Sequence, residues 1–282
     1  MTRCLFVSDL HGREDRYEKL LAAAALERPS AVFLGGDLLP FAGGGHAGDF
    51  LQDWLAPRLE ALRARLGPLY PRVLAIFGND DPRAEEPSLA ALQARGLLEH
   101  AHGRRLELAG GFTAYGYACV PPTPFRLKDW ERYDVSRFVD PGCVSPEEGQ
   151  RSVSADEQDV RWGTIAGDLE RLAGTDELSR AVFLFHSPPY GGALDRAALD
   201  GRALDHAPLD VHVGSIAIHR FVEARQPLVT LHGHVHESAR LTGRWSERVG
   251  RTLCLSAAHD GPELALVRFD LDDPERATRE LL

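Results

Sequence analysis

The segment Ser8-Asp9-Leu10-His11-Gly12 follows a short apolar run, Cys4-Leu5-Phe6-Val7, and precedes a charged segment that begins near Glu14. A strand that ends in an aspartate, with a histidine two positions later, can direct a carboxylate oxygen and an imidazole nitrogen at one point. That point lies beyond the carboxyl end of the strand, where open α/β sheets bind their ligands. Asp, Gly and Ser also end strands simply by forming turns. The functional interpretation therefore depends on how the later strands end.

Two further apolar runs end in the same kind of polar residue. A buried strand predicted at residues 31–34 leads into Gly35-Gly36-Asp37, and another at residues 73–77 leads into Gly78-Asn79-Asp80-Asp81. Helical periodicity follows each of the first three strands. Three βα units in succession favour a largely parallel sheet with helices packed outside it.

The rest of the chain continues as a mixture of helices and strands, with one long interruption. The expected helices lie at residues 14–27, 49–66, 88–95, 155–172 and 215–225. The later strands are expected at residues 106–108, 112–118, 181–185, 228–231, 251–255 and 264–271, and the last two are expected to close a second sheet. Residues from about 121 to 154 lack clear periodicity, which in a compact domain usually marks a functional or a mobile segment. The aromatic residues of this excursion either line a substrate rim or hold it against the body.

Five strand ends carry side chains that can coordinate a metal ion. They are Asp9 with His11, Asp37, Asn79, His186, and His234 with His236. Carboxylate, amide oxygen and imidazole without thiolate suit manganese, iron, zinc or a similar transition ion. Seven ligands are too many for one catalytic ion, but they suit two ions about 3.5–4 Å apart that share a bridging carboxylate.

Each of these residues also has a purely structural interpretation. Asp37 and Asn79 follow glycines and fit ordinary turns, and a lone His186 is more often a buried, hydrogen-bonded histidine than a ligand. His234 and His236 carry more weight, because positions i and i+2 on an extended chain face the same side. His46, which follows Gly43-Gly44-Gly45, is expected to be a solvated loop residue.

The ordered set D-x-H, G-D, G-N, a strand-end H and G-H-x-H, which spans residues 9 to 236, resembles the calcineurin-like metallophosphoesterases. Residues 186–190, 212–215 and 231–238 are similar to the prokaryotic branch that resembles cyclic-nucleotide phosphodiesterases. The resemblance implies an α/β fold, a four-layer sandwich of two mixed β-sheets flanked by helices. We expect a single domain over residues 1–282.

The resemblance also implies the cofactors and the activity. Two divalent or trivalent transition-metal ions (Mn, Fe, Zn or Ni) would activate a metal-bridging hydroxide for in-line attack on phosphorus. The implied ligands are Asp9, His11 and His236 for the first ion, Asn79, His186 and His234 for the second, and Asp37 as the bridge. A phosphodiesterase is favoured, and a phosphomonoesterase, a nucleotide pyrophosphatase and a non-catalytic metal-binding scaffold are the alternatives.

The acid that protonates the leaving group is less clear, because Asp80 stands where many relatives have a histidine. Two nearby cations keep an aspartate ionised, so we expect Asp80 to orient its neighbours more than to donate a proton. His212 is the competing candidate, although it also fits a loop residue that positions Ser215. The helix start at Gly214 and Ser215 is expected to offer backbone N–H groups to a phosphate oxygen.

The composition limits the kinds of molecule that the protein is expected to bind. A net charge of -10 and a pI of about 5.6 argue against broad nucleic-acid binding, which needs many Lys and Arg contacts to phosphate. Bound cations let an acidic protein take an anionic substrate, and a small phosphate ester is expected. The four cysteines form no C-x-x-C pattern, and no apolar run has the length of a membrane span. These features predict a cytoplasmic protein, and the oligomeric state is left open.

Overall fold

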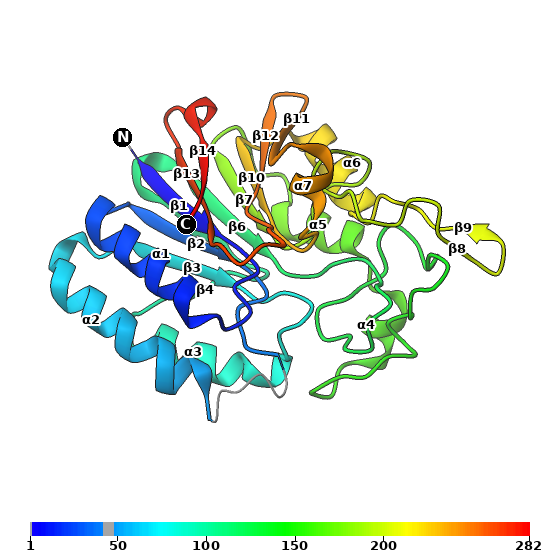
Figure 1. Ribbon diagram of the computed structural model, residues 1–282, viewed down its shortest axis with the longest axis horizontal. Coiled ribbons are helices and arrows are strands. Elements are labelled where there is room, and N and C mark those ends of the chain that lie inside the picture. The colour runs from blue at the N-terminus through cyan, green and yellow to red at the C-terminus, as the bar shows by residue number, and fades with distance from the viewer. Residues whose placement is uncertain (1, 42–47) are drawn as a thin grey trace.

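The computed structural model describes residues 2–41 and 48–282, so His46 and its neighbouring glycines lie outside the described residues. Two six-stranded mixed sheets form the centre of the molecule and are flanked by helices (Figure 1), which confirms the predicted fold class. The first sheet has the order β14-β13-β1-β2-β3-β4 and the second has the order β11-β12-β10-β7-β6-β5. Strand β2 contacts β7 and β3 contacts β6, so the two sheets face each other.

The strands of the first sheet are β1 (Arg3–Val7), β2 (Ala31–Gly35), β3 (Arg72–Ile76), β4 (Glu99–His100), β13 (Ala265–Asp270) and β14 (Thr278–Leu281). Those of the second sheet are β5 (Arg105–Glu107), β6 (Thr113–Tyr117), β7 (Ala181–Phe185), β10 (Val229–His232), β11 (Ser246–Val249) and β12 (Thr252–Ser256). A separate hairpin consists of β8 (Ala203–Leu204) and β9 (Ala207–Pro208).

The α-helices are α1 (Glu14–Glu27), α2 (Ala56–Leu66), α3 (Glu86–Ala94), α4 (Glu157–Trp162), α5 (Ile165–Ala173), α6 (Ile216–Arg225) and α7 (Ser238–Thr242). Helices α1 to α3 lie along the first sheet and α5 and α6 lie beside the second (Figure 1). Among the described residues, none of the helices combines the length and the hydropathy that a membrane span requires.

The parallel strands β1, β2 and β3 place their carboxyl ends at one edge of the first sheet. Their side chains are almost entirely buried, as expected for strands covered on both faces. The loops that follow these strands carry Asp9, Asp37 and Asn79. In the second sheet, β7 and β10 are also parallel neighbours, and they lead into His186 and the segment of His234 and His236.

Three local expectations differ from the structure. Strand β13 was expected in the second sheet, but it pairs antiparallel with β1 in the first, where Phe269 packs against Phe33. The helix expected at residues 155–172 is two helices, because the chain leaves helical geometry at Gly163 and the Thr164 side chain caps α5. The helix expected at residues 49–66 begins as a π-helix, Phe50–Leu55, before α2.

The excursion at residues 121–154 contains no named helix or strand. A fully buried ion pair between Lys128 and Glu131 fixes it from within, and Thr123 donates to the same carboxylate. Trp130 is buried whereas Phe125 and Phe138 are exposed. Part of the aromatic set therefore holds the excursion in place, and part of it faces solvent.

Candidate metal centre

The loop after β1 is bonded to the loop after β2. The backbone N–H of Asp9 donates to the carbonyl of Gly36 at 3.0 Å, and that of His11 donates to the carbonyl of Asp37 at 2.8 Å. These two hydrogen bonds bring the side chains of Asp9, His11 and Asp37 to one place. The bonds between these two loops therefore position three of the ligand candidates.

Four of the predicted ligands have left-handed backbone conformations: φ is 56° at Asp9, 46° at His11, 51° at Asp37 and 71° at His234. Residues with a side chain seldom adopt this region, and strained backbone of this kind, at about 1–3 kcal/mol for each residue, concentrates at functional sites. The strain thus supports a functional interpretation that is independent of the motif.

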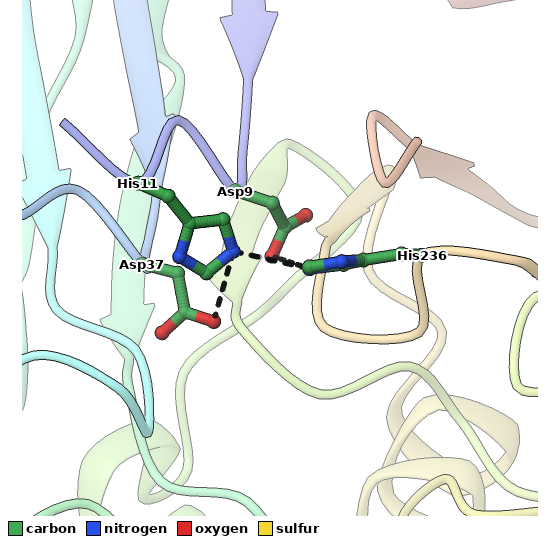
Figure 2. Close-up of side chains that lie close together, drawn as sticks. All are labelled: Asp9, His11, Asp37 and His236. Atoms are coloured by element: carbon green, nitrogen blue, oxygen red, sulfur yellow. Dashed lines mark hydrogen bonds and ion pairs between the residues drawn. The ribbon is translucent and has the colours of Figure 1, made fainter. Parts of the chain in front are cut away.

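Asp9, His11, Asp37 and His236 form the tighter of two groups, with ligand atoms that all lie within 4.8 Å of one another (Figure 2). The Nε2 atom of His236 lies 3.3 Å from His11 Nε2 and 3.4 Å from Asp9 Oδ1. His11 Nε2 is 3.9 Å from Asp37 Oδ2. Four side chains from three separate segments therefore point into one small space.

The second group lies on the other side of Asp37. His186 Nε2 is 3.1 Å from Asn79 Oδ1 and 3.3 Å from Asp37 Oδ2, and the rings of His186 and His234 are 5.2 Å apart. This group is looser: among the described residues, only the first brings three or more His, Cys, Asp or Glu ligand atoms within 4.8 Å. The Oδ2 atom of Asp37 faces the imidazole nitrogens of both groups, where a bridging ligand would stand.

Hydrogen bonds to the backbone orient these ligands. His186 Nδ1 donates to the carbonyl of Gly35 at 2.7 Å, which fixes the ring so that Nε2 faces the oxygens of Asn79 and Asp37. The backbone N–H of His234 donates to Asp9 Oδ1 at 3.0 Å. The ligand set is thus held by the protein itself before any ion binds.

The donor set fits a metal ion. Asp9 Oδ2 and His11 Nδ1 are buried without a hydrogen-bond partner, although buried polar atoms are nearly always bonded. The Nε2 atoms of His11 and His236 face each other at 3.3 Å, a contact of two acceptors unless a proton or a cation lies between them. Carboxylate oxygens and imidazole nitrogens in such an arrangement suit a transition ion.

The electrostatics of the cluster favour charged carboxylates. Burial opposes ionisation of Asp9 and Asp37, but the surrounding imidazoles outweigh it and hold both pKa values below the usual range. Burial likewise opposes protonation of His186 and His236, yet the facing carboxylates raise their pKa values to about 10 and about 9. The site therefore attracts positive charge.

The glycines that precede Asn79 and His234 have no room for a side chain. A Cβ atom at Gly78 would lie 2.2 Å from Asp37 Oδ1 and 2.6 Å from His186 Nε2. One at Gly233 would lie 1.9 Å from the Ser8 hydroxyl. No side chain fits at either position without displacing the ligands.

Asp81 is a positioning residue that the sequence interpretation did not single out. Its carboxylate is fully buried and accepts backbone N–H groups from Leu38 at 3.0 Å, Leu39 at 2.8 Å and Gly78 at 2.8 Å. It therefore ties the loop of Asp37 to the loop of Asn79. Burial and the Asp37 carboxylate raise its pKa to about 7. The only sequence signal was a second aspartate in a turn.

Asp80 lies inside the site. Its backbone N–H donates to Asp37 Oδ1 at 2.9 Å, and its carboxylate accepts the Asn79 side-chain amide at 3.0 Å. Its Oδ2 atom is 3.9 Å from His11 Nδ1. Burial and the Asp37 carboxylate raise the pKa of Asp80 to about 7.

His212 is placed elsewhere. Its Nδ1 donates to the buried carboxylate of Asp195 at 2.8 Å, and its ring lies 5.9 Å from that of Tyr190. Within the described part of the chain, no hydrogen bond, ion pair or ring contact joins His212 to a predicted ligand. The structure brings together the seven metal-ligand candidates and Asp80, and it does not bring His212 into contact with them.

The expectation that the start of α6 binds phosphate is wrong. The backbone N–H groups of Ile216 and Ala217 and the hydroxyl of Ser215 all donate to Asp134. The N–H of Gly214 donates to Asp195. A carboxylate from the excursion thus occupies the position that was expected to hold a phosphate oxygen.

Comparison with known proteins gives one family. The model of the calcineurin-like phosphoesterases matches residues 2–238, well over half of the chain. No match was found among curated proteins.

Solved structures share the fold. One is 18% identical with a TM-score of 0.60, covering 99% of this chain and 98% of its own. The protein TT1561 of Thermus thermophilus is 16% identical with a TM-score of 0.57 and the same coverage. A dimetal phosphatase from Danio rerio is 14% identical with a TM-score of 0.47, covering 94% of this chain and 91% of its own. At these identities the likeness to the first two structures concerns the fold alone, and nothing is argued from the third.

Proposed function

The chain belongs to the calcineurin-like phosphoesterase family, and from this premise we propose that it is a phosphodiesterase with a dinuclear metal centre. The observation that carries the proposal is the position of Asp37, whose Oδ2 atom lies 3.9 Å from His11 Nε2 and 3.3 Å from His186 Nε2. A carboxylate between two imidazole-containing groups is the arrangement that two neighbouring ions require.

Each group of side chains has its own task in this proposal. Asp9, His11 and His236 would hold one ion, Asn79, His186 and His234 would hold the other, and Asp37, which faces both groups, would bridge them. Two such ions, of Mn, Fe, Zn or Ni, neutralise charge on the phosphate oxygens and lower the pKa of water. The bonds of Gly35 to His186 and of Asp9 to the His234 backbone keep the ligands aligned.

The supply of a proton to the leaving group is the weakest step in the site. Asp80 contacts Asn79 and Asp37, and nearby cations keep such a carboxylate ionised. Among the described residues, His212 has no hydrogen bond, ion pair or ring contact with the ligand candidates. We therefore propose that the enzyme prefers esters whose leaving groups need little protonation, such as aryl esters.

The test uses protein stripped of metal and reloaded separately with manganese, iron, zinc or nickel. Its substrates are bis-aryl and mono-aryl phosphates, cyclic nucleotides and dinucleotides. Metal-dependent hydrolysis with a higher kcat/KM for diesters than for monoesters is the expected result. Faster hydrolysis of monoesters would replace the diester proposal by a phosphomonoesterase. Two bound ions without turnover of any ester would make the chain a metal-binding scaffold.

A further inference from the structure

An exposed aromatic ring stands directly beside the candidate metal centre. Phe41 is 56% exposed, and its ring is stacked on that of His11 with the centroids 4.5 Å apart and the planes at 14°. Other rings near this loop are buried: Tyr17, Phe50 and Trp54 pack on one another behind it. Phe41 is thus set apart from the core cluster.

The backbone just before Phe41 is held by two neighbouring loops. The carboxylate of Asp81 accepts the N–H groups of Leu38 and Leu39, and the N–H of Gly12 donates to the carbonyl of Leu38 at 2.9 Å. A Cβ atom at Gly12 would lie 2.3 Å from the ring of Pro40, so the two loops are in close contact. The chain reaches Phe41 from a fixed anchor.

One face of the Phe41 ring packs on His11, which we assign as a ligand of the first ion. Among the described residues, Phe41 is the one phenylalanine, tyrosine or tryptophan with a ring contact to an assigned ligand, so an ester group on a phosphate held at that ion would lie near an exposed aromatic ring. An aromatic ring binds another flat ring more strongly than a saturated one of the same size, because the ring quadrupoles interact.

We propose that Phe41 is a specificity-determining residue that stacks on an aromatic group of the substrate ester. The inference rests on the proposed function and names its substrate class: phosphate esters that carry an aryl group or a nucleobase. This aromatic preference has a different origin from the leaving-group preference, because it depends on binding and not on the departing oxygen.

Two non-hydrolysable ligands separate binding from chemistry. Benzylphosphonate and cyclohexylmethylphosphonate have the same charge and nearly the same size, and only the first is aromatic. Isothermal titration calorimetry on the metal-loaded protein gives both Kd values. We expect the benzyl compound to bind about fivefold more tightly, the magnitude of one aromatic pair.

Three variants test whether Phe41 causes the difference between the Kd values of the two phosphonates. Phe41→Leu keeps an apolar side chain over His11 but removes the ring, so the Kd ratio falls to about 1. Phe41→Trp keeps the ratio. Leu69→Ala removes an equally exposed apolar side chain, 55% exposed in the turn after α2, and leaves the ratio unchanged. Metal content is measured for every variant.

The outcomes are distinct. Equal binding of both phosphonates to the unmodified protein, or a ratio that Phe41→Leu does not change, overturns the inference while the proposed function stands. Loss of metal in Phe41→Leu together with equal weakening of both ligands makes Phe41 a support for His11 only, which also overturns it. Discrimination between the phosphonates without hydrolysis of any ester rejects the proposed function and keeps the aromatic subsite.

Discussion

The imidazole of His236 lies against the imidazole of His11, with the two Nε2 atoms 3.3 Å apart, although 225 positions separate the residues in the chain. His11 belongs to the loop after the first strand of one sheet, and His236 follows the central strand β10 of the other. The contact spans the junction of the two sheets. An ion bound between these two histidines would therefore be held by residues of both sheets.

Replacing the proposed bridge tests the two-ion model directly. Asp37→Asn keeps the size of the side chain but removes its negative charge and one metal-binding oxygen. We expect fewer than two bound ions and a loss of kcat/KM beyond about a hundredfold, because even partners outside the ligand shell cost 10–100-fold. Elemental analysis and aryl phosphate kinetics provide the measurements. The exposed Asp273→Asn is the control, and two tightly bound ions in Asp37→Asn would contradict the bridge.

Asp81 should act on the site without touching a ligand atom of the metal. Asp81→Asn retains one acceptor oxygen and turns an NH2 group toward the backbone donors of Leu38, Leu39 or Gly78. Since a buried backbone N–H left without an acceptor costs about 1–3 kcal/mol, we expect the free energy of unfolding to fall by about that amount. Metal affinity should fall about tenfold or more, as followed by competition with a chelator. A purely structural role would lower stability in urea and leave the metal affinity of the folded protein unchanged.

The absence of a side chain at Gly78 is predicted to be a requirement of the site. In Gly78→Ala the new methyl group overlaps Asp37 Oδ1 and His186 Nε2, so one or both must move. We expect at least about tenfold weaker metal binding, since small displacements of ligands are costly. Gly167→Ala in helix α5 is the matched control, because its neighbours lie 3.3 Å away or farther and alanine favours a helix. Equal metal affinity in the two variants would show that the loops tolerate the shift.

His102 should make the fold sensitive to acid. Burial, together with His100 and Arg83, lowers its pKa to about 3, and its Nδ1 accepts the N–H of Ala118 at 3.0 Å. The unfolded chain therefore takes up a proton at higher pH than the folded one. The contribution to stability is complete above the unfolded pKa of about 6.5 and is lost as the pH falls from there toward about 3.

The variant His102→Asn keeps an acceptor and removes the titrating group. Between pH 6.5 and pH 4 we expect the unmodified protein to lose about 3 kcal/mol more free energy of unfolding than the variant, at about 1.4 kcal/mol per pH unit. Urea denaturation of metal-free protein at each pH measures this difference. His206→Asn, at an exposed position, should follow the unmodified protein. Parallel curves for His102→Asn would contradict the lowered pKa, because they would mean that His102 takes up its proton at the same pH in the folded and unfolded chains.

The strand ends were predictable because a parallel sheet puts the carboxyl ends of its strands at one edge. That rule, together with the apolar run before each residue, was enough to predict that Asp9, Asp37 and Asn79 lie at one edge. The sheet to which β13 belongs was not predictable, because an apolar strand carries no mark of its partner. Asp81 and Asp134 were missed for a related reason: each carboxylate binds backbone N–H groups of a distant segment. Such a bond leaves no periodic pattern in the sequence.

The pairing of β1 with β13 also determines when the first sheet can be completed during synthesis of the chain. Strand β1, which leads into Asp9 and His11, is made long before one of its two neighbours, β13 (Ala265–Asp270). His236 likewise emerges late. During synthesis, the edge of β1 that pairs with β13 therefore stays unpaired until residues 265–270 have left the ribosome. A chain cut short between His236 and β13 would therefore carry all seven ligand candidates but would lack the strand that pairs with β1.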